Sequence, residues 1–424
     1  MSIKYERRKI SDGIHFSTAV DERFKTTSVS VNLMTPLTEE TASANAIIPF
    51  ILAKSSSDYP TLTAINMKLS SLYGAWISGS VGKLGDTQLM SLRSSAIADK
   101  YTLEGEKISS ELIDMLISCL MSPYIEDGRF YDKDFQLKKQ ELLDDIDAEI
   151  NDKRGYAFIR AGKLIYEGEP SAITAHGDRA HAEALTSEAV YVRYKELLKT
   201  AQIEVVFAGS GDFTEAYDKM KNAMLGMERA YAGANTSGFS PVKDTPAEMT
   251  DTLEIAQSKM VMAFKSGFKN YPATVMFLAI FGATPFSKLF VNVREKLSLC
   301  YYCSAGYNNK KGVLTVDSGV ETENIEKARA EILNQLDAMI KGDFTDEEME
   351  NARLSVINSL RSKNDSLYSI TDWYLSKAYM NETGSPEDEI ESILAVTRDE
   401  ITEAAGSFRL DTVYRLIGKG GEEE

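Results

Sequence analysis

A polar stretch in the middle of the chain constrains the fold more than any other feature of the sequence. Residues 228–250 (ERAYAGANTSGFSPVKDTPAEMT) are rich in Gly, Ser, Thr, Pro and Ala and lack sustained periodicity, which is typical of an interdomain linker. The order of predicted elements restarts after this stretch. We therefore expect an N-terminal lobe over residues 1–227, the linker, and a C-terminal lobe over residues 251–424.

Apolar periodicity predicts the elements of each half. Before the linker, alternation predicts strands at 28–35, 75–82, 88–95 and 203–208, and helical spacing predicts helices at 41–53, 61–73, 107–121, 132–165 and 187–199. After the linker, we predict strands at 259–264, 300–307 and 312–319, and helices at 271–281, 286–296, 323–340 and 345–362. The two lists indicate similar halves.

Length and charge limit the functions that the chain can have. At 424 residues it is too long for one ordinary core, and its apolar and charged fractions of 43% and 26% are average for a globular protein. A net charge of -17 repels polyanions, so we expect neither nucleic-acid nor anionic-membrane binding. The first residues contain no apolar stretch of signal-peptide length, and the apolar run 44–53 is too short to span a bilayer. We predict a cytoplasmic protein.

The cysteines are too few to predict a disulfide framework. The chain has three, at Cys119, Cys300 and Cys303. Cys300 and Cys303 form a CxxC, but no second pair or nearby histidine accompanies them. The alternating pattern around them predicts packed thiols in a strand, and a zinc site is the less favoured alternative.

Histidine is equally sparse. Besides His15, the chain has only His176 and His181, which lie five residues apart near Asp178 and Glu183. That spacing does not form an inverted zinc motif, although a fortuitous metal site stays an alternative. We interpret the segment as a surface loop that enters a helix.

Residues 281–307 carry the strongest signature, FGATPFSKLFVNVREKLSLCYYCSAGY. They resemble the C-terminal segment of pitrilysin/insulinase-type zinc peptidases, in which a glycine-rich turn precedes Ser-Arg-Leu-Phe, then Arg-Glu-Lys, then a Tyr seven residues after that Arg. Lys288 replaces the first Arg of this pattern. The matching residues are Ser287, Leu289, Phe290, Arg294, Glu295, Lys296, Leu299 and Tyr301.

Residues 54–86 resemble the segment that follows the family's zinc helix, with Gly74 and Ser78 at its turn and strand. The resemblance runs from about residue 10 to about residue 415. It implies an α+β fold of two related lobes, each an antiparallel-rich sheet covered by helices, as in LuxS/pitrilysin-like metallohydrolases. It is greatest to the non-catalytic members that bacteria encode beside a catalytic one.

The resemblance also implies where zinc would bind, and the ligands are missing there. The family's His-x-x-Glu-His motif aligns with residues 46–50, where Ala46 and Phe50 replace the two imidazoles and Pro49 replaces the general base. Asp145 aligns with the third ligand, with Glu141 and Glu149 as alternatives. One oxygen ligand holds zinc poorly, so we expect no metal and no cofactor in this chain.

Arg294 and Tyr301 match the family pair that binds the substrate carbonyl, and a salt-bridged Arg before a half-buried Tyr is the structural alternative. The catalytic site of the family has two halves, the zinc motif and this Arg/Tyr pair. Because the zinc half-site is lost here and the Arg/Tyr half-site is retained, our leading hypothesis is a non-catalytic subunit. This subunit would pair with a zinc-bearing homologue and supply Arg294 and Tyr301 in trans. The substrate would be a peptide or protein segment that binds as an additional strand at a sheet edge. The alternatives are a structural or chaperone-like scaffold and an autonomous metallopeptidase with rearranged ligands. Pairing with itself or with another chain stays open.

Two further features have plain interpretations. The charge on helix 132–165 is typical of a solvated face, and a binding face for a basic partner is the alternative. Phe50, Ile51 and Leu52 are typical of core packing, and a peptide groove in place of the zinc site is the alternative.

Overall fold

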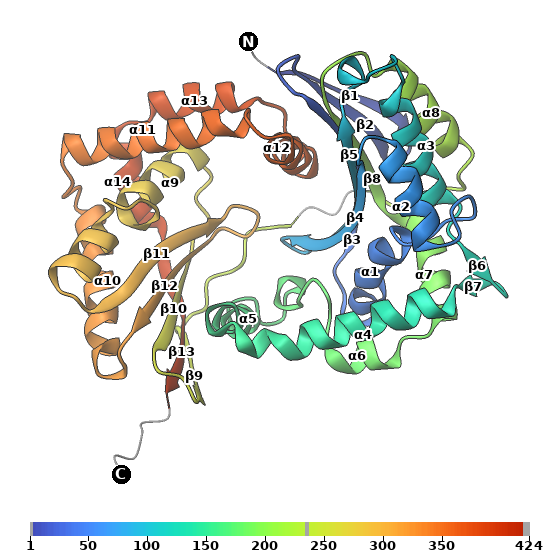
Figure 1. Ribbon diagram of the computed structural model, residues 1–424. Helices are drawn as coiled ribbons and strands as arrows, with labels where there is room; N and C mark the ends of the chain where they lie inside the picture. Colours follow the sequence, from blue (N-terminus) through green and yellow to red (C-terminus); the bar gives the residue numbers. More distant parts are fainter. Residues whose placement is uncertain (1–2, 234–236, 419–424) are drawn as a thin grey trace. The chain divides into compact units, whose positions relative to one another are not determined.

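The computed structural model describes residues 3–233 and 237–418, which form two compact units (Figure 1). Unit 1 comprises 1–147, 173–236 and 363–383, and unit 2 comprises 148–172, 237–362 and 384–424. Each unit is therefore built from three separate segments of the chain. The predicted lobes were continuous, so the observed units differ from them by the exchange of 148–172 and 363–383.

A six-stranded mixed sheet forms the centre of unit 1. Its order is β1-β2-β8-β3-β5-β4; only β2 and β8 pair in parallel, and all other neighbours are antiparallel. β4 lies at one edge and β1 at the other. The strands are β1 (Lys4–Ser11), β2 (Ile14–Val20), β3 (Thr26–Pro36), β4 (Trp76–Leu84), β5 (Thr87–Ile97) and β8 (Gln202–Gly209). A separate hairpin joins β6 (Ile125–Glu126) to β7 (Arg129–Phe130).

A five-stranded sheet forms the centre of unit 2 and repeats the topology of the first. Its order is β11-β12-β10-β13-β9, and only β13 and β9 pair in parallel. Taken in chain order, β9 to β13 occupy the places of β2, β3, β4, β5 and β8. The prediction of two related, antiparallel-rich lobes is confirmed. The strands are β9 (Ala247–Leu253), β10 (Ser258–Lys265), β11 (Cys300–Asn308), β12 (Val313–Val320) and β13 (Arg409–Gly418).

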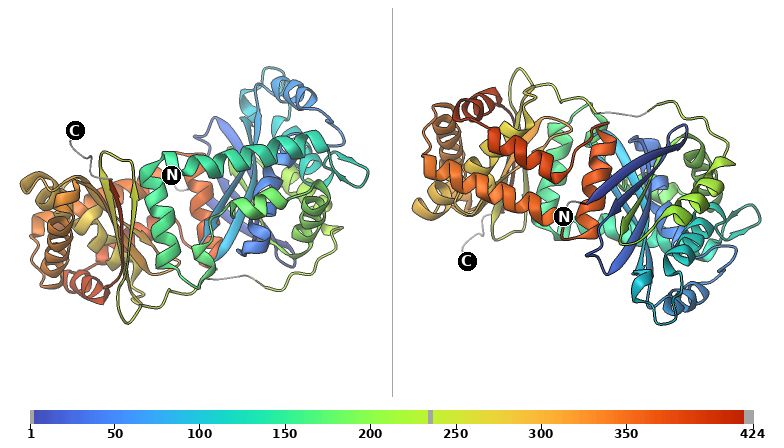
Figure 2. Two further views of the ribbon diagram at one scale, coloured as in Figure 1. Left: turned by 90° about the horizontal axis from the view of Figure 1, so that it is seen from below. Right: turned by 90° about the horizontal axis from the view of Figure 1, so that it is seen from above.

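Helices cover one face of the unit 1 sheet and bury its main core (Figures 1 and 2). The predicted helices at 107–121 and 187–199 are confirmed as α3 and α7. Helix α8 was not among the predicted helices. The helices of this unit are α1 (Glu39–Leu52), α2 (Leu62–Ser71), α3 (Ile108–Met121), α4 (Asp132–Ala148), α6 (Arg179–Ala184), α7 (Ser187–Thr200), α8 (Thr214–Leu225) and α12 (Leu367–Tyr379).

Unit 2 has its own helical layer and core. Two π-helical segments, Ala279–Ala283 and Leu289–Lys296, follow its first helix after β10. The predicted helices at 271–281 and 286–296 therefore exist but are irregular. The α-helices of this unit are α5 (Lys153–Ile165), α9 (Tyr271–Leu278), α10 (Ile325–Ile340), α11 (Asp346–Lys363), α13 (Pro386–Ala395) and α14 (Arg398–Ser407).

The prediction of a single helix at 132–165 is wrong, because the helix is interrupted before Asp152 and a new one starts after it. The Asp152 side chain accepts a hydrogen bond from the backbone N–H of Arg154 and caps the start of α5. A short 3₁₀ segment, Glu149–Asn151, separates α4 from this cap. The cap separates α4, whose residues up to Asp147 belong to unit 1, from α5, which belongs to unit 2.

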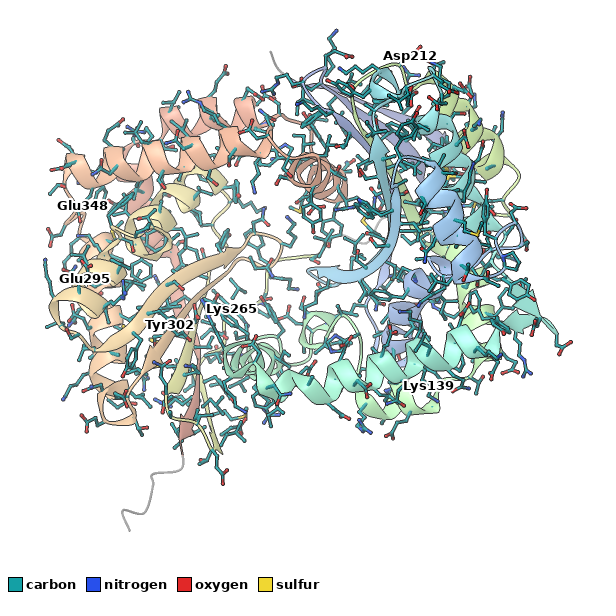
Figure 3. All side chains as sticks on the ribbon, viewed as in Figure 1. Lys139, Asp212, Lys265, Glu295, Tyr302 and Glu348 are labelled. Atoms are coloured by element: carbon teal, nitrogen blue, oxygen red, sulfur yellow. The ribbon has the colours of Figure 1, made fainter. Side chains whose placement is uncertain are left out.

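Helices α5 and α12 lie in the two exchanged segments, 148–172 and 363–383. Each covers the face of its unit's sheet that the other helices leave open (Figure 1). In unit 2, Ala157 and Ala161 of α5 pack with Ala263 and Tyr414, while Lys265, labelled in Figure 3, donates to the carbonyl of Ile165 at 2.7 Å. These contacts join residues distant in the sequence. They explain why local patterns did not predict the exchange.

In unit 1, α12 covers the strands β1, β2 and β8. The ring of Tyr374 stacks on Tyr5 with centroids 3.7 Å apart, and Ile370 packs with Ala19 and Ala208. The exchange therefore buries apolar side chains in this unit as well.

Part of the predicted linker lies outside the described residues, namely 234–236. Its last residues, 247–250, form the beginning of β9. Within the described ranges, each helix is too short or too polar to cross a lipid bilayer.

Candidate functional site

The segment aligned with the zinc motif forms the second half of α1. Ala46 and Pro49 are buried and Phe50 is partly buried, so this part of the helix faces the core. The interpretation of core packing is confirmed for Ile51 and Leu52, which belong to the main cluster of unit 1. The helix continues through Pro49.

The edge strand β4 packs directly on this helix. A Cβ at Gly79 would lie 2.4 Å from the carbonyl carbon and oxygen of Pro49 and 2.6 Å from the backbone nitrogen of Phe50. Glycine is therefore required at this contact, because any side chain would collide with the helix backbone.

The residues present do not fit a zinc ion. Ala46, Pro49 and Phe50 have no side-chain donor, and the Lys138 ammonium lies 5.9 Å from the centroid of the Phe50 ring. A second cation there would be repelled. Asp145, on the exposed side of α4, is a single carboxylate.

The two alternative carboxylates do not complete the site. Glu141 forms an ion pair with Lys138, and Glu149 lies in the 3₁₀ segment after α4. In the ranges that the structure describes, no three His, Cys, Asp or Glu residues group closely enough to hold a metal.

A buried polar network that sequence analysis missed holds α1 in place. The Asn45 side-chain amide donates to Gln88 Oε1 at 2.7 Å, and Arg193 Nε donates to Asn45 Oδ1 at 2.7 Å. Gln88 in turn donates to the carbonyl of Ala42 at 2.9 Å. The signal was present as a lone Asn in the apolar run 44–53, because a buried amide needs partners.

The histidines lie in two different environments. Asp178 caps α6 by accepting from the backbone N–H of His181, and its carboxylate also contacts His181 Nδ1 at 2.6 Å, which raises the pKa of that imidazole. The interpretation of 176–181 as a loop that enters a helix is confirmed. His15 Nδ1 lies 3.2 Å from the buried carboxylate of Glu204.

Glu204 belongs to a charged cluster on the sheet. Arg7 Nε donates to Glu204 Oε2 at 3.0 Å. Burial raises the pKa of Glu204, but hydrogen bonds from His15 and Arg7 more than offset it, so the pKa lies below its ordinary value. The carboxylate is therefore paired, as buried charges must be.

A β-bulge shapes the start of β11. Cys300 pairs with Val320 but Tyr302 pairs with Gly319, so Tyr301 is the extra residue. In a regular strand, Cys300 and Cys303 would point to opposite faces. The bulge places both in the core of unit 2, where they are free thiols, and leaves Tyr301 60% exposed.

Arg294 and Tyr301 are brought together by this irregular backbone. Arg294 lies in the second π-helical segment, and its Nε donates to the backbone carbonyl of Tyr301 at 2.9 Å. Ser298, between them, has a φ of 49°. Because π-helices and bulges gather at functional sites, this combination favours a role beyond packing.

Their side chains are held but accessible. The Arg294 guanidinium lies 4.5 Å from the centroid of the Phe290 ring. The Tyr301 hydroxyl donates to Glu321 Oε1 at 2.7 Å, and this hydrogen bond raises the tyrosine pKa. Their neighbours in sequence, Glu295 and Tyr302, are labelled in Figure 3.

Two other positions of the 281–307 signature make structural contacts. A Cβ at Gly282 would lie 2.6 Å from the Cβ of Ala305 and 2.7 Å from Cδ1 of Leu289, so glycine permits the helical segment to approach β11. Lys288, which replaces the family's Arg, lies 3.3 Å from Glu348 Oε1. Its cation therefore still has an acidic partner.

Comparisons with known proteins agree on one family. The family model described as the peptidase M16 inactive domain matches residues 184–356. A probable inactive metalloprotease of Bacillus subtilis, YmfF, is 26% identical over 99% of this chain and 100% of its own length.

Two solved structures show the same fold. A conserved protein from Enterococcus faecalis has a TM-score of 0.89 at 24% identity, covering all of both chains. A chain of complex III2 from Candida albicans, with Inz-5 bound, has a TM-score of 0.74 at 14% identity, covering 97% of this chain and 95% of that one.

Proposed function

Because the chain belongs to the M16 peptidase family, we propose that it is a non-catalytic subunit that pairs with a zinc-bearing homologue and supplies Arg294 and Tyr301 to the partner's site. The observation that carries the proposal is the contrast between the two half-sites. Residues 46–50 are apolar and packed, whereas Tyr301 is exposed on a bulge beside Arg294.

The chemistry of the pair suits a peptide substrate. A guanidinium and a phenol hydroxyl both donate hydrogen bonds, and donors placed at a developing oxyanion lower the barrier to acyl transfer. The hydroxyl now donates to Glu321, so it must exchange that acceptor for the substrate oxygen. An extended peptide would pair with a sheet edge, as open edges allow.

One finding supports the subunit role, and a second suits the location that we propose for the pair. The same fold occurs in a chain of complex III2, which is an assembly of several chains. All three cysteines of this chain are free, which suits the reducing cytoplasm where we place the pair.

The test is reconstitution with a zinc-bearing homologue. Arg294→Ala and Tyr301→Phe should each lower the kcat of the assembled pair by roughly 10- to 1000-fold, the range of one lost transition-state donor, without weakening association. The matched controls are Arg361→Ala, an exposed arginine of α11, and Tyr368→Phe, an exposed tyrosine of α12. Both controls should keep full turnover.

The alternative function is a scaffold or chaperone-like subunit. Unchanged kcat in both variants, with the complex shown to be assembled, would leave only that function. Chelator-sensitive cleavage by this chain alone would instead show an autonomous peptidase with rearranged ligands.

A further inference from the structure

A pocket opens at the end of unit 1's sheet where β4 begins, away from the polar network of α1. Its volume is about 500 Å³, and we call it the Tyr73 pocket after one of its walls. Tyr73, Trp76 and Tyr101 supply its aromatic side chains, and Lys25 and Ile97 also line it. None of these residues has a part in the proposed role of Arg294 and Tyr301.

The aromatic side chains of the pocket face solvent. Tyr73, Trp76 and Tyr101 are 38%, 46% and 41% exposed, and the neighbouring Leu103 is 87% exposed. Single exposed apolar residues are common, but a group around a concave surface marks a binding site. Trp and Tyr are also the side chains that contribute most to binding sites in other proteins.

The backbone at Tyr73 is strained. Its φ is 57°, a left-handed conformation that a bulky residue rarely adopts, and Gly74 follows with a φ of 75°. The Tyr73 hydroxyl donates to Glu106 Oε1 at 2.7 Å and accepts from the backbone N–H of Leu103 at 3.0 Å. These bonds hold the ring at the pocket wall, and such strain gathers at ligand-binding positions.

The strand that enters the pocket defines the shape of the ligand. β4 is the last strand of its sheet, and within the described residues no strand pairs with its outer edge. Trp76 is its first residue. An open edge offers a row of backbone donors and acceptors that an extended peptide satisfies.

Lys25 defines the charge of the ligand. Lys25 is one of the lining residues, and within the described part of the chain its side chain forms no ion pair. Lys100 lies nearby with its ammonium 5.4 Å from the Tyr101 ring, but it is already paired with Glu22. The free cation therefore favours a carboxylate beside the bound side chain.

We propose that an extended peptide pairs with the outer edge of β4 and places an aromatic side chain, with a carboxylate next to it, in the Tyr73 pocket. The proposal rests on the peptide substrate class of the proposed function and adds a side-chain preference to it. It makes no use of Arg294 or Tyr301, so each idea can fail without the other.

The test uses the full chain alone. The protein has two tryptophans, at 76 and 373, so Trp373→Phe leaves Trp76 as the only indole reporter. The probe is a dye-labelled Thr-Val repeat peptide that carries one Phe-Glu pair, titrated by polarisation and by Trp76 emission. We expect saturable binding in both signals.

Four changes should weaken that binding. Tyr101→Ala, or Phe→Ser in the peptide, should raise Kd about 10- to 100-fold, because an aromatic side chain loses its buried contact. Proline at successive peptide positions should abolish binding, because it removes backbone donors. Lys25→Glu should weaken the Phe-Glu peptide and strengthen a Phe-Lys peptide.

The control is Leu394→Ser, a 56% exposed leucine on α13 of unit 2, which should bind as the parent does. A silent Trp76 signal, equal binding by Tyr101→Ala, or preference of the parent for Phe-Lys would overturn the proposal. The proposed function is tested separately, by the turnover of the reconstituted pair with Arg294→Ala and Tyr301→Phe.

Discussion

The segment from α1 to β4 in unit 1 and the segment from α9 to β11 in unit 2 hold the same place in the shared topology, yet they differ in regularity. In unit 1 a continuous helix buries Ala46 and Pro49. In unit 2 two π-helical segments and a bulge expose Tyr301 beside Arg294. A regular helix lets apolar side chains pack closely, while π-helical segments and bulges change the direction of individual side chains.

Each segment depends on one glycine at the contact between helix and edge strand. In unit 1 the glycine is on the strand, Gly79, and faces the helix backbone. In unit 2 it is on the helical side, Gly282, and mainly faces the side chains of Ala305 and Leu289. Backbone cannot move aside as a rotatable side chain can. An added side chain should therefore cost more stability at the unit 1 contact than at the unit 2 contact.

The largest expected difference from a catalytic relative concerns zinc. With no donor at 46, 49 or 50, purified protein should hold no stoichiometric zinc and cleave no peptide alone. Added zinc should leave the unfolding temperature unchanged, because a ligand that does not bind the folded state cannot stabilise it. Elemental analysis and calorimetry check this.

About one zinc per chain would contradict that expectation. Unit 1 would then hold a metal site after all, and the contrast between its packed segment and the exposed pair of unit 2 would no longer apply. Replacing Ala46, Pro49 and Phe50 by His, Glu and His need not restore a site. Asp145 reaches less far than a glutamate would, and Lys138 stays beside position 50.

The next largest effect should come from Gly79→Ala. The new methyl would meet the Pro49 backbone at 2.4 Å, so the helix and strand must separate, and we expect a loss of about 2–4 kcal/mol in the free energy of unfolding. Gly282→Ala should lose somewhat less, about 1–3 kcal/mol, because one of its two nearest neighbours, Leu289, can change rotamer, although the Cβ of Ala305 at 2.6 Å moves only with its strand. Urea denaturation measures both.

Gly162→Ala is the control for this pair. Gly162 lies inside α5 with no atom within 4 Å of its added Cβ, so alanine should stabilise by up to about 1 kcal/mol. If Gly282→Ala proved more damaging than Gly79→Ala, the rigid helix backbone would not be what makes the unit 1 contact more sensitive.

The smallest effect concerns the Tyr301 hydroxyl. Its hydrogen bond to the Glu321 carboxylate favours the neutral phenol and raises the tyrosine pKa, so Glu321→Gln should lower that pKa toward its ordinary value. NMR titration of ¹³C-labelled tyrosine, assigned with Tyr301→Phe, detects the shift. Glu323→Gln, two residues away, should leave the pKa unchanged, and an equal shift there would disprove a specific hydrogen bond.

Much of the fold could be predicted from the sequence because its causes are local. Apolar spacing is enough for helices such as α3 and α7, and the restarted order of elements indicated the repeated topology. The helix at 132–165 was the clear error. Helical periodicity continues on both sides of Asp152, so the cap that breaks the helix has only a weak sequence signal.

By itself, the sequence determined the chemistry that is available. Ala46, Pro49 and Phe50 cannot bind zinc in any fold, and the 281–307 signature identified Arg294 and Tyr301 as the candidate substrate-binding pair. Only the tertiary structure decided how these residues are held. The exchange of α5 and α12 and the contacts of Asn45 join residues far apart in the chain, and the bulge at Tyr301 depends on how β11 pairs with β12. Such contacts depend on where distant segments meet, which local periodicity does not encode.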